Sequence, residues 1–124
     1  MIEDSNCRNP RLENCRNPYQ GTAKRVLCVC SAGLLRSPTA AVVLHREFGF
    51  NTRSAGLESE YALIVVDEAL LEWADEIVCM TAEQADQLMV RTTKPVKCLK
   101  ISDNFAYMDP ELQATIERRY KEMG

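Results

Sequence analysis

Strand-like and helix-like segments alternate four times along this 124-residue chain, and no other feature limits its possible folds as strongly. Strands are predicted at residues 25–30, 51–56, 75–80 and 96–101, and the first of them, RVLCVC, is apolar on both faces. Strands separated by helices are joined by crossovers, so they run parallel and the helices cover both faces of the sheet. We therefore predict an α/β fold, with a four-stranded parallel sheet flanked by helices on both faces. A ligand site is expected at the carboxyl edge of the strands.

Four helices are predicted between and after the strands, because apolar residues recur there at three- and four-residue spacing. Their expected starts are Ser37 as N-cap with Pro38 at the first helical position, Val65, Thr81 in a capping box with Gln84, and Asp109-Pro110. Gly49 is expected to end the first helix. The predicted inward-facing residues are Ala40, Ala41, Leu44 and Phe48; Val66, Ala69, Leu70 and Trp73; Ala85, Leu88 and Met89; and Leu112, Ile116 and Tyr120.

Composition and charge narrow the class of protein. Hydrophobic residues make up 46% and charged residues 27%, which is typical of a globular domain, and no apolar stretch approaches the roughly 20 residues of a membrane span. The net charge of −3 argues against broad binding to nucleic acid or to an anionic membrane. Residues 1–22 contain NCRNP twice and lack an apolar stripe. We expect them to be a polar extension, dispensable for folding, that precedes a domain at residues 23–124.

The six cysteines do not form a metal-binding pattern. The chain contains no C-x-x-C, and its one histidine, His45, is expected on a helix surface, so no zinc site is predicted. Four of the cysteines lie in apolar runs, which is typical of reduced, buried thiols in a cytoplasmic protein. Cys79 and Cys98 are expected in the core, whereas nothing in the sequence supports a disulfide between Cys7 and Cys15.

The loop after the first strand carries the candidate chemistry. Cys30 ends the strand, and Arg36 and Ser37 follow at the predicted helix start. A loop between a strand and a helix directs its backbone N–H groups toward one anion site, and Gly33 can supply a positive φ there. Arg36 can bind two phosphate oxygens, and the same surroundings favour a thiolate at Cys30. The predicted phosphate-binding residues are Ser31, Ala32, Gly33, Leu34, Leu35, Arg36 and Ser37.

This C-x5-R-S loop, VCSAGLLRSPTA at residues 29–40, resembles the phosphate-binding loop of the low-molecular-weight protein tyrosine phosphatases. RSAG at 53–56 and ADEIVCM at 74–80 are similar to the family's second and third strands. LLRSPTAA and NFAYMDPEL, at 34–41 and 104–112, resemble segments of a compact bacterial and phage group within that family. The resemblance covers residues 24–124.

The resemblance implies a two-step phosphatase reaction without a cofactor. Cys30 attacks the phosphoryl group of a phosphotyrosyl protein or a small aryl phosphate, while Arg36 and the loop amides hold its oxygens. Asp103, in a D-x-aromatic sequence that lacks the family's proline, protonates the leaving phenolate. It then activates the water that releases inorganic phosphate. Phe105, with Tyr107 or Tyr61, can form an apolar wall for the ring.

The loop departs from the larger family members at two positions. Gly33 stands where they have a bracing asparagine, and Leu35 stands where they have a second cysteine that can form a disulfide with the nucleophile. Cys28 lies on the same strand face as Cys30, but residues i and i+2 of an extended strand rarely form a disulfide.

Three other functions fit parts of the pattern. A phosphocysteine carrier of the sugar phosphotransferase IIB type also has CSAG after a strand, but it lacks an arginine at the sixth position and needs no acid such as Asp103. A thiol-coupled arsenate reductase of similar fold needs two further cysteines near the end of the third strand, where only Cys79 stands. A silent phosphotyrosine-binding module would keep the loop without turnover.

Overall fold

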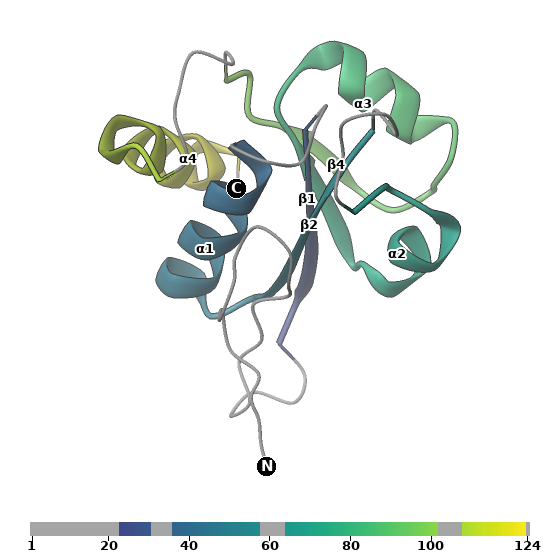
Figure 1. Cartoon of the computed structure of the whole chain (residues 1–124), viewed down its shortest axis with the longest axis horizontal. Helices are drawn as coiled ribbons and strands as arrows, with labels where there is room; N and C mark the ends of the chain where they lie inside the picture. The colour runs from purple at the N-terminus through teal and green to yellow at the C-terminus, as the bar shows by residue number, and fades with distance from the viewer. Residues whose placement is uncertain (1–22, 31–35, 58–63, 102–107, 124) are drawn as a thin grey trace.

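A parallel sheet of four strands forms the centre of the molecule (Figure 1). The structure is a computed structural model, and it describes residues 23–30, 36–57, 64–101 and 108–123. Its elements are β1 (Arg25–Cys30), α1 (Arg36–Phe48), β2 (Asn51–Gly56), α2 (Glu68–Trp73), β3 (Glu76–Cys79), α3 (Ala82–Met89), β4 (Val96–Cys98) and α4 (Pro110–Glu122). The strand order is β2-β1-β3-β4, and all three pairings are parallel. The predicted fold class is confirmed.

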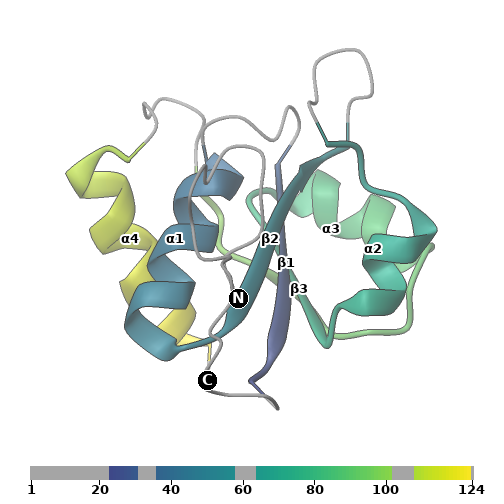
Figure 2. The same cartoon turned by 60° about the horizontal axis from the view of Figure 1, so that its bottom comes forward.

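Helices cover both faces of the sheet, with α1 and α4 on one side and α2 and α3 on the other (Figure 2). Alternate residues of β1 point to the two sides. Val26, Cys28 and Cys30 join the core under α1 and α4, whereas Leu27 and Val29 join the core under α2 and α3. Because β1 is central and covered on both faces, Val26 to Cys30 are all buried, which explains its continuous apolar sequence.

Helix α1 begins at Arg36, two residues before the predicted first helical position at Pro38, so Ser37 is not its N-cap. Arg36 is already helical, and the buried Ser37 hydroxyl donates to the carbonyl oxygen of Ala55 in β2. Gly49 ends the helix as predicted, with a φ of 74° that glycine adopts without steric cost. His45 is half-buried rather than fully on the surface, because its Nδ1 lies 2.8 Å from the carbonyl oxygen of Phe50.

The second helix is shorter than predicted, and this changes its inward face. Val65 pairs with Gly56 in a short parallel bridge, and Asp67 then caps the helix by accepting the N–H of Leu70 at 2.8 Å. Since the helix begins at Glu68, Leu71 is buried and Ala69, which we predicted to face inward, is exposed.

The predicted starts of the last two helices are confirmed. Thr81 and Gln84 form the full capping box of α3, and Asp109 caps α4 with Pro110 in its first turn. Leu112, Ile116 and Tyr120 face the core as predicted. Met89 does not, because it is the last residue of α3 and its side chain is 62% exposed.

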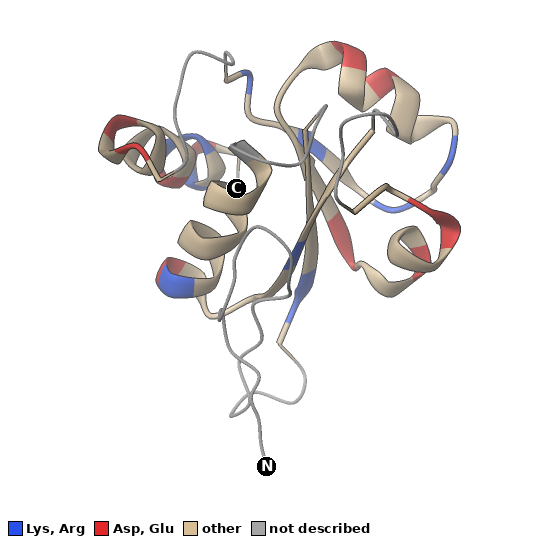
Figure 3. Ribbon diagram, in the orientation of Figure 1, with Lys and Arg blue, Asp and Glu red and all other residues tan. Residues whose placement is uncertain are grey.

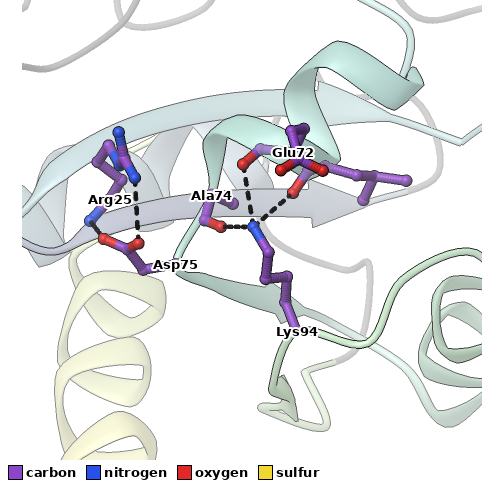
Figure 4. A network of polar contacts seen from close by, with 6 residues as sticks. Arg25, Glu72, Ala74, Asp75 and Lys94 are labelled. Atoms are coloured by element: carbon purple, nitrogen blue, oxygen red, sulfur yellow. Dashed lines mark hydrogen bonds and ion pairs between the residues drawn. The ribbon is translucent and has the colours of Figure 1, made fainter.

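Polar contacts tie the amino-terminal edge of the sheet together (Figure 4). Asp75 accepts the backbone N–H of Arg25 at 3.0 Å and its guanidinium at 3.3 Å, and chiefly the first of these bonds lowers the pKa of Asp75. Lys94 donates to the carbonyl oxygens of Leu71 at 3.3 Å, Glu72 at 2.9 Å and Ala74, which terminates α2 with a cation, the charge that a helix carboxyl end favours.

Charged residues of both signs occur along α4, whereas the charged residues of α2 and α3 are all acidic (Figure 3). One carboxylate is instead buried: the Glu76 side chain is 4% exposed and pairs with Lys97 at 3.0 Å and Lys24 at 3.3 Å. The Tyr120 hydroxyl donates to it at 2.7 Å. Burial by itself would raise the pKa of Glu76, but the bonds from Tyr120 and Lys97 and the two lysine charges outweigh it and lower the pKa.

We expect Glu76→Gln to lower the free energy of unfolding by about 2 kcal/mol at neutral pH, because two ion pairs with a buried carboxylate are lost. A lowered pKa means that this contribution is present above the pKa of an unfolded glutamate and is lost as pH falls through the folded value. The gap between the parent and the variant should therefore narrow below about pH 4, measured by urea unfolding. Glu117→Gln, which breaks the i,i+4 pair with Lys121, is the control and should cost below about 0.5 kcal/mol. Equal losses in the two variants would contradict this role of Glu76.

Among the described residues, no helix is long and apolar enough to cross a membrane.

Candidate active site

The strand, loop and helix predicted around the candidate cysteine are present at the carboxyl edge of the sheet. Strand β1 ends at Cys30 and α1 begins at Arg36, so residues 31–35 connect them. Cys30 pairs in register with Gly56, the last residue of β2, and its carbonyl oxygen accepts the N–H of Leu57 at 3.0 Å. The five connecting residues and the side chain of Arg36 lie outside the described residues. The backbone thus places Cys30 and the first turn of α1 at one edge.

A buried pair of polar side chains links the strand to the helix. The Cys30 thiol donates to Ser37 Oγ at 3.3 Å, and the Ser37 hydroxyl donates to the carbonyl oxygen of Ala55 at 3.4 Å. Cys30 is 3% exposed and Ser37 is fully buried. When the sulfur loses its proton, the same hydroxyl lies within reach to donate to the thiolate. The sequence indicated a Ser37 bond to this sulfur, but not the bond to Ala55 on a neighbouring strand, which holds the hydroxyl in place.

Cys28, the other thiol on this face of β1, is in a different environment. It is fully buried, and the burial, together with the charges of Cys30 and Glu76, raises the pKa of its thiol far above the ordinary value. Cys28 is therefore a protonated thiol at neutral pH. A thiolate is the nucleophilic form of cysteine, so Cys28 is not suited to attack phosphorus.

A contact that the sequence did not reveal joins α1 to the chain segment before α4. Thr39 Oγ1, in the first turn of α1, accepts the backbone N–H of Met108 at 2.9 Å, across 69 positions of sequence. Met108 has a φ of 60°, in the left-handed region that non-glycine residues seldom adopt. On the other side of residues 102–107, Ile101 is buried in the same core cluster as Cys30. Both flanks of that segment therefore lie at the site.

Two aspartates, Asp103 and Asp109, flank the segment before α4, and the structure describes the second of them. Asp109 Oδ1 accepts the N–H groups of Glu111 at 2.8 Å and Leu112 at 3.3 Å, so it caps α4 as the sequence predicted. Asp103, the predicted acid, lies outside the described residues, as do Phe105, Tyr107 and Tyr61.

The cysteines required by the arsenate reductase alternative do not surround Cys30. Cys79 pairs in register with Val29, and its side chain joins the core under α2 and α3, whereas Cys30 faces α1 and α4. Cys98 packs against the same core as Cys79 and is half-buried. The sheet therefore separates these two thiols from Cys30. Within the described parts of the chain, no three His, Cys, Asp or Glu side chains are grouped as metal ligands.

Comparisons with known proteins identify the fold. No protein-family model matches the chain, and no curated protein matches it by sequence. Among solved structures, the YwlE arginine phosphatase of Geobacillus stearothermophilus is 22% identical, with a TM-score of 0.63 over 81% of this chain and 92% of that one. YfkJ of Bacillus subtilis is 20% identical, with a TM-score of 0.59 over 84% and 96% of the two chains. A YwlE mutant of B. subtilis is 23% identical, with a TM-score of 0.55 over 82% and 99%. The chain therefore has the fold of the low-molecular-weight protein tyrosine phosphatases, the family that its cysteine loop resembles.

Proposed function

We propose that this protein is a cysteine-dependent phosphatase that hydrolyses phosphotyrosine or other aryl phosphate monoesters through a cysteinyl-phosphate intermediate. The observation that carries the proposal is the buried contact of Cys30 with Ser37, 3.3 Å long, at the carboxyl end of the central strand. That contact lies within a C-x5-R-S loop that opens a helix. The similar structures, one of them named as an arginine phosphatase, support a phosphoryl-transfer function.

Each of these residues has a defined role in the proposed reaction. The Cys30 thiolate forms the S–P bond as the P–O bond to the leaving group breaks, while Arg36 and the amides of residues 31–35 bind the three remaining oxygens. Once Cys30 is a thiolate, the Ser37 hydroxyl, 3.3 Å away, rotates from the Ala55 carbonyl oxygen and donates to the sulfur. This bond stabilises the sulfur as the attacking group, and again as the leaving group in the second step. Asp103 gives its proton to the leaving oxygen and then accepts one from the water that hydrolyses the intermediate. Phe105 and Tyr107 form the wall beside the substrate ring.

The contact between Thr39 and Met108 supports a way to position Asp103. The described residues on either side of Asp103 are fixed, Ile101 by the core and Met108 by the Thr39 hydroxyl, and these two attachments limit the reach of the acid between them. The proposal therefore makes Thr39 a positioning residue.

We expect Thr39→Val to lower kcat on phosphotyrosine by about 5- to 10-fold, the worth of one hydrogen bond, because the N–H of Met108 loses its acceptor. The fall should be smaller on an activated aryl phosphate, whose leaving group needs less protonation, if Thr39 acts through the acid. Thr39→Ser keeps the hydroxyl and should restore the parental ratio of the two rates. An equal loss on both substrates would contradict the positioning role.

A substrate panel tests the proposed function directly. Release of phosphate should be measured with phosphotyrosine, phosphoserine and phosphoarginine, with vanadate as the inhibitor. We expect many turnovers and the highest kcat/KM on phosphotyrosine. A higher kcat/KM on phosphoarginine would support phosphatase activity but overturn the proposed tyrosine specificity. The protein would then share the activity for which the Geobacillus protein is named.

The same assay separates the other three functions. A phosphocysteine carrier would retain at most one phosphoryl group per chain and would release no phosphate in excess of the protein. A binding module would bind phosphotyrosine without release, and an arsenate reductase would consume thiols when arsenate is added. Any of these results would overturn the proposal.

The described cysteines, Cys28, Cys30, Cys79 and Cys98, are all free thiols, and we infer a cytoplasmic location, where thiols stay reduced.

A further inference from the structure

Two cysteines that the proposed reaction does not use lie side by side on the face of the sheet opposite to Cys30. Cys79 of β3 and Cys98 of β4 are direct partners in the parallel register. Both side chains point to the α2 and α3 face, and the Cys79 thiol donates to the carbonyl oxygen of Thr81 at 3.6 Å. Cys79 is fully buried, whereas Cys98 is partly exposed.

We propose that Cys79 and Cys98 form a redox-active dithiol, a modification site that a hydroperoxide converts reversibly into a disulfide. Register partners on adjacent strands have Cα atoms about 4.8 Å apart, within the roughly 4.4–6.8 Å that a disulfide spans. Strand β4 is three residues long and forms the outer edge of the sheet. An edge strand with a neighbour on only one side can shift to bring the two sulfurs to bonding distance.

The exposure of the two thiols assigns them different steps. Cys98 meets solvent, so its sulfur attacks the peroxide. The O–O bond breaks, an S–O bond forms, and the products are a sulfenic acid and water. The sulfur of Cys79 then attacks that of Cys98, forming the S–S bond and releasing the sulfenic oxygen as water, which takes up the Cys79 proton. Two electrons pass from the thiol pair to the peroxide. A reducing dithiol reverses the reaction by thiol–disulfide exchange.

The environment of Cys79 makes it the second reactant. Burial, and then the neighbouring Cys98, raise the pKa of Cys79 to about 12, while its thiol also lies 3.6 Å from the carbonyl oxygen of Thr81. A protonated, inaccessible thiol reacts slowly with peroxide in solution. Its attack on the Cys98 sulfenic acid requires that the Cys79 proton leave as the S–S bond forms. The register holds the two residues next to each other, so this step is intramolecular, and that proximity offsets the low thiolate fraction of Cys79. The pair is separated from Cys30 by the sheet, so its oxidation does not require the candidate nucleophile.

Peptide mapping tests this site, because trypsin places each of the two cysteines on its own fragment. Residues 54–91 contain only Cys79, and residues 98–100 contain only Cys98. The full chain and its Cys30→Ser variant are treated with hydrogen peroxide, blocked with N-ethylmaleimide and digested without reduction. We expect these two fragments to be linked in both proteins, lighter than their sum by two hydrogen atoms, and to separate on treatment with dithiothreitol. This readout needs no turnover, so it stands or fails independently of the proposed function.

Matched variants assign the linkage. Cys98→Ala should abolish the linked fragment, whereas Cys28→Ala, a change on the other face of the sheet, should leave it intact. The linked fragment in the unsubstituted chain is the primary result, so the test does not depend on how the variants fold. Maleimide on both fragments, a sulfinic acid at Cys98 without linkage, or linkage of Cys98 to a different cysteine would each overturn the proposal.

Discussion

Replacing Cys30 by serine should abolish turnover of aryl phosphates. The hydroxyl of serine is a far weaker nucleophile than a thiolate, and no other described side chain lies ready to replace it. Cys28 is the nearest alternative, but burial keeps it protonated. Removing the nucleophile of a covalent mechanism costs roughly 10⁴-fold or more in kcat. The measurement is phosphate release from phosphotyrosine, with vanadate binding measured beside it.

Binding should survive this change, since Arg36 and the loop amides hold the anion and serine is close to cysteine in size. Cys28→Ala is the matched control. It removes a buried sulfur on the same strand face and should lower stability while kcat of the folded protein stays near the parental value. Activity of Cys30→Ser within tenfold of the parent, or loss of activity in folded Cys28→Ala alone, would remove Cys30 from the proposed mechanism.

Asp103→Asn should lower kcat on phosphotyrosine by roughly 10²–10⁴-fold, the usual contribution of a general acid. The loss should shrink on an activated aryl phosphate, because that leaving group departs without a proton. Asp109→Asn is the informative comparison. Asp109 is occupied as the cap of α4 by the N–H groups of Glu111 and Leu112, so it acts on stability and not on proton transfer. Asparagine is also a good N-cap, so the free energy of unfolding of this variant should lie within about 1 kcal/mol of the parental value.

Rates on both substrates and melting temperatures decide between the two aspartates. A leaving-group-dependent loss in Asp109→Asn at unchanged melting temperature, with parental activity in Asp103→Asn, would exchange their roles. Because Asp103 follows a segment anchored at Ile101, its effect should also be partly reproduced by Thr39→Val, which releases the other anchor at Met108.

Local signals in the sequence were sufficient wherever the structure depends on residues a few positions apart. The end of β1 at Cys30, the capping box of Thr81 with Gln84, and the start of α4 at Asp109 were all predicted correctly. Caps and strand ends are governed by backbone groups within one turn, so the nearby residue types determine them. The alternation of strands and helices likewise determined the parallel sheet.

Contacts between distant segments were decided only by the tertiary structure. The sequence assigned Ser37 to a cap, but the arrival of Ala55 on β2 gave its hydroxyl a buried acceptor and drew it inward. Ala69 was predicted to face the core, yet the bridge between Gly56 and Val65 shortened α2 and put Leu71 there. Cys79 and Cys98 each looked like separate core residues until the register of β3 and β4 placed them together. In each case the partner lies on another element. Its position follows from strand order and register, which the packing of whole faces determines and no short stretch of sequence contains.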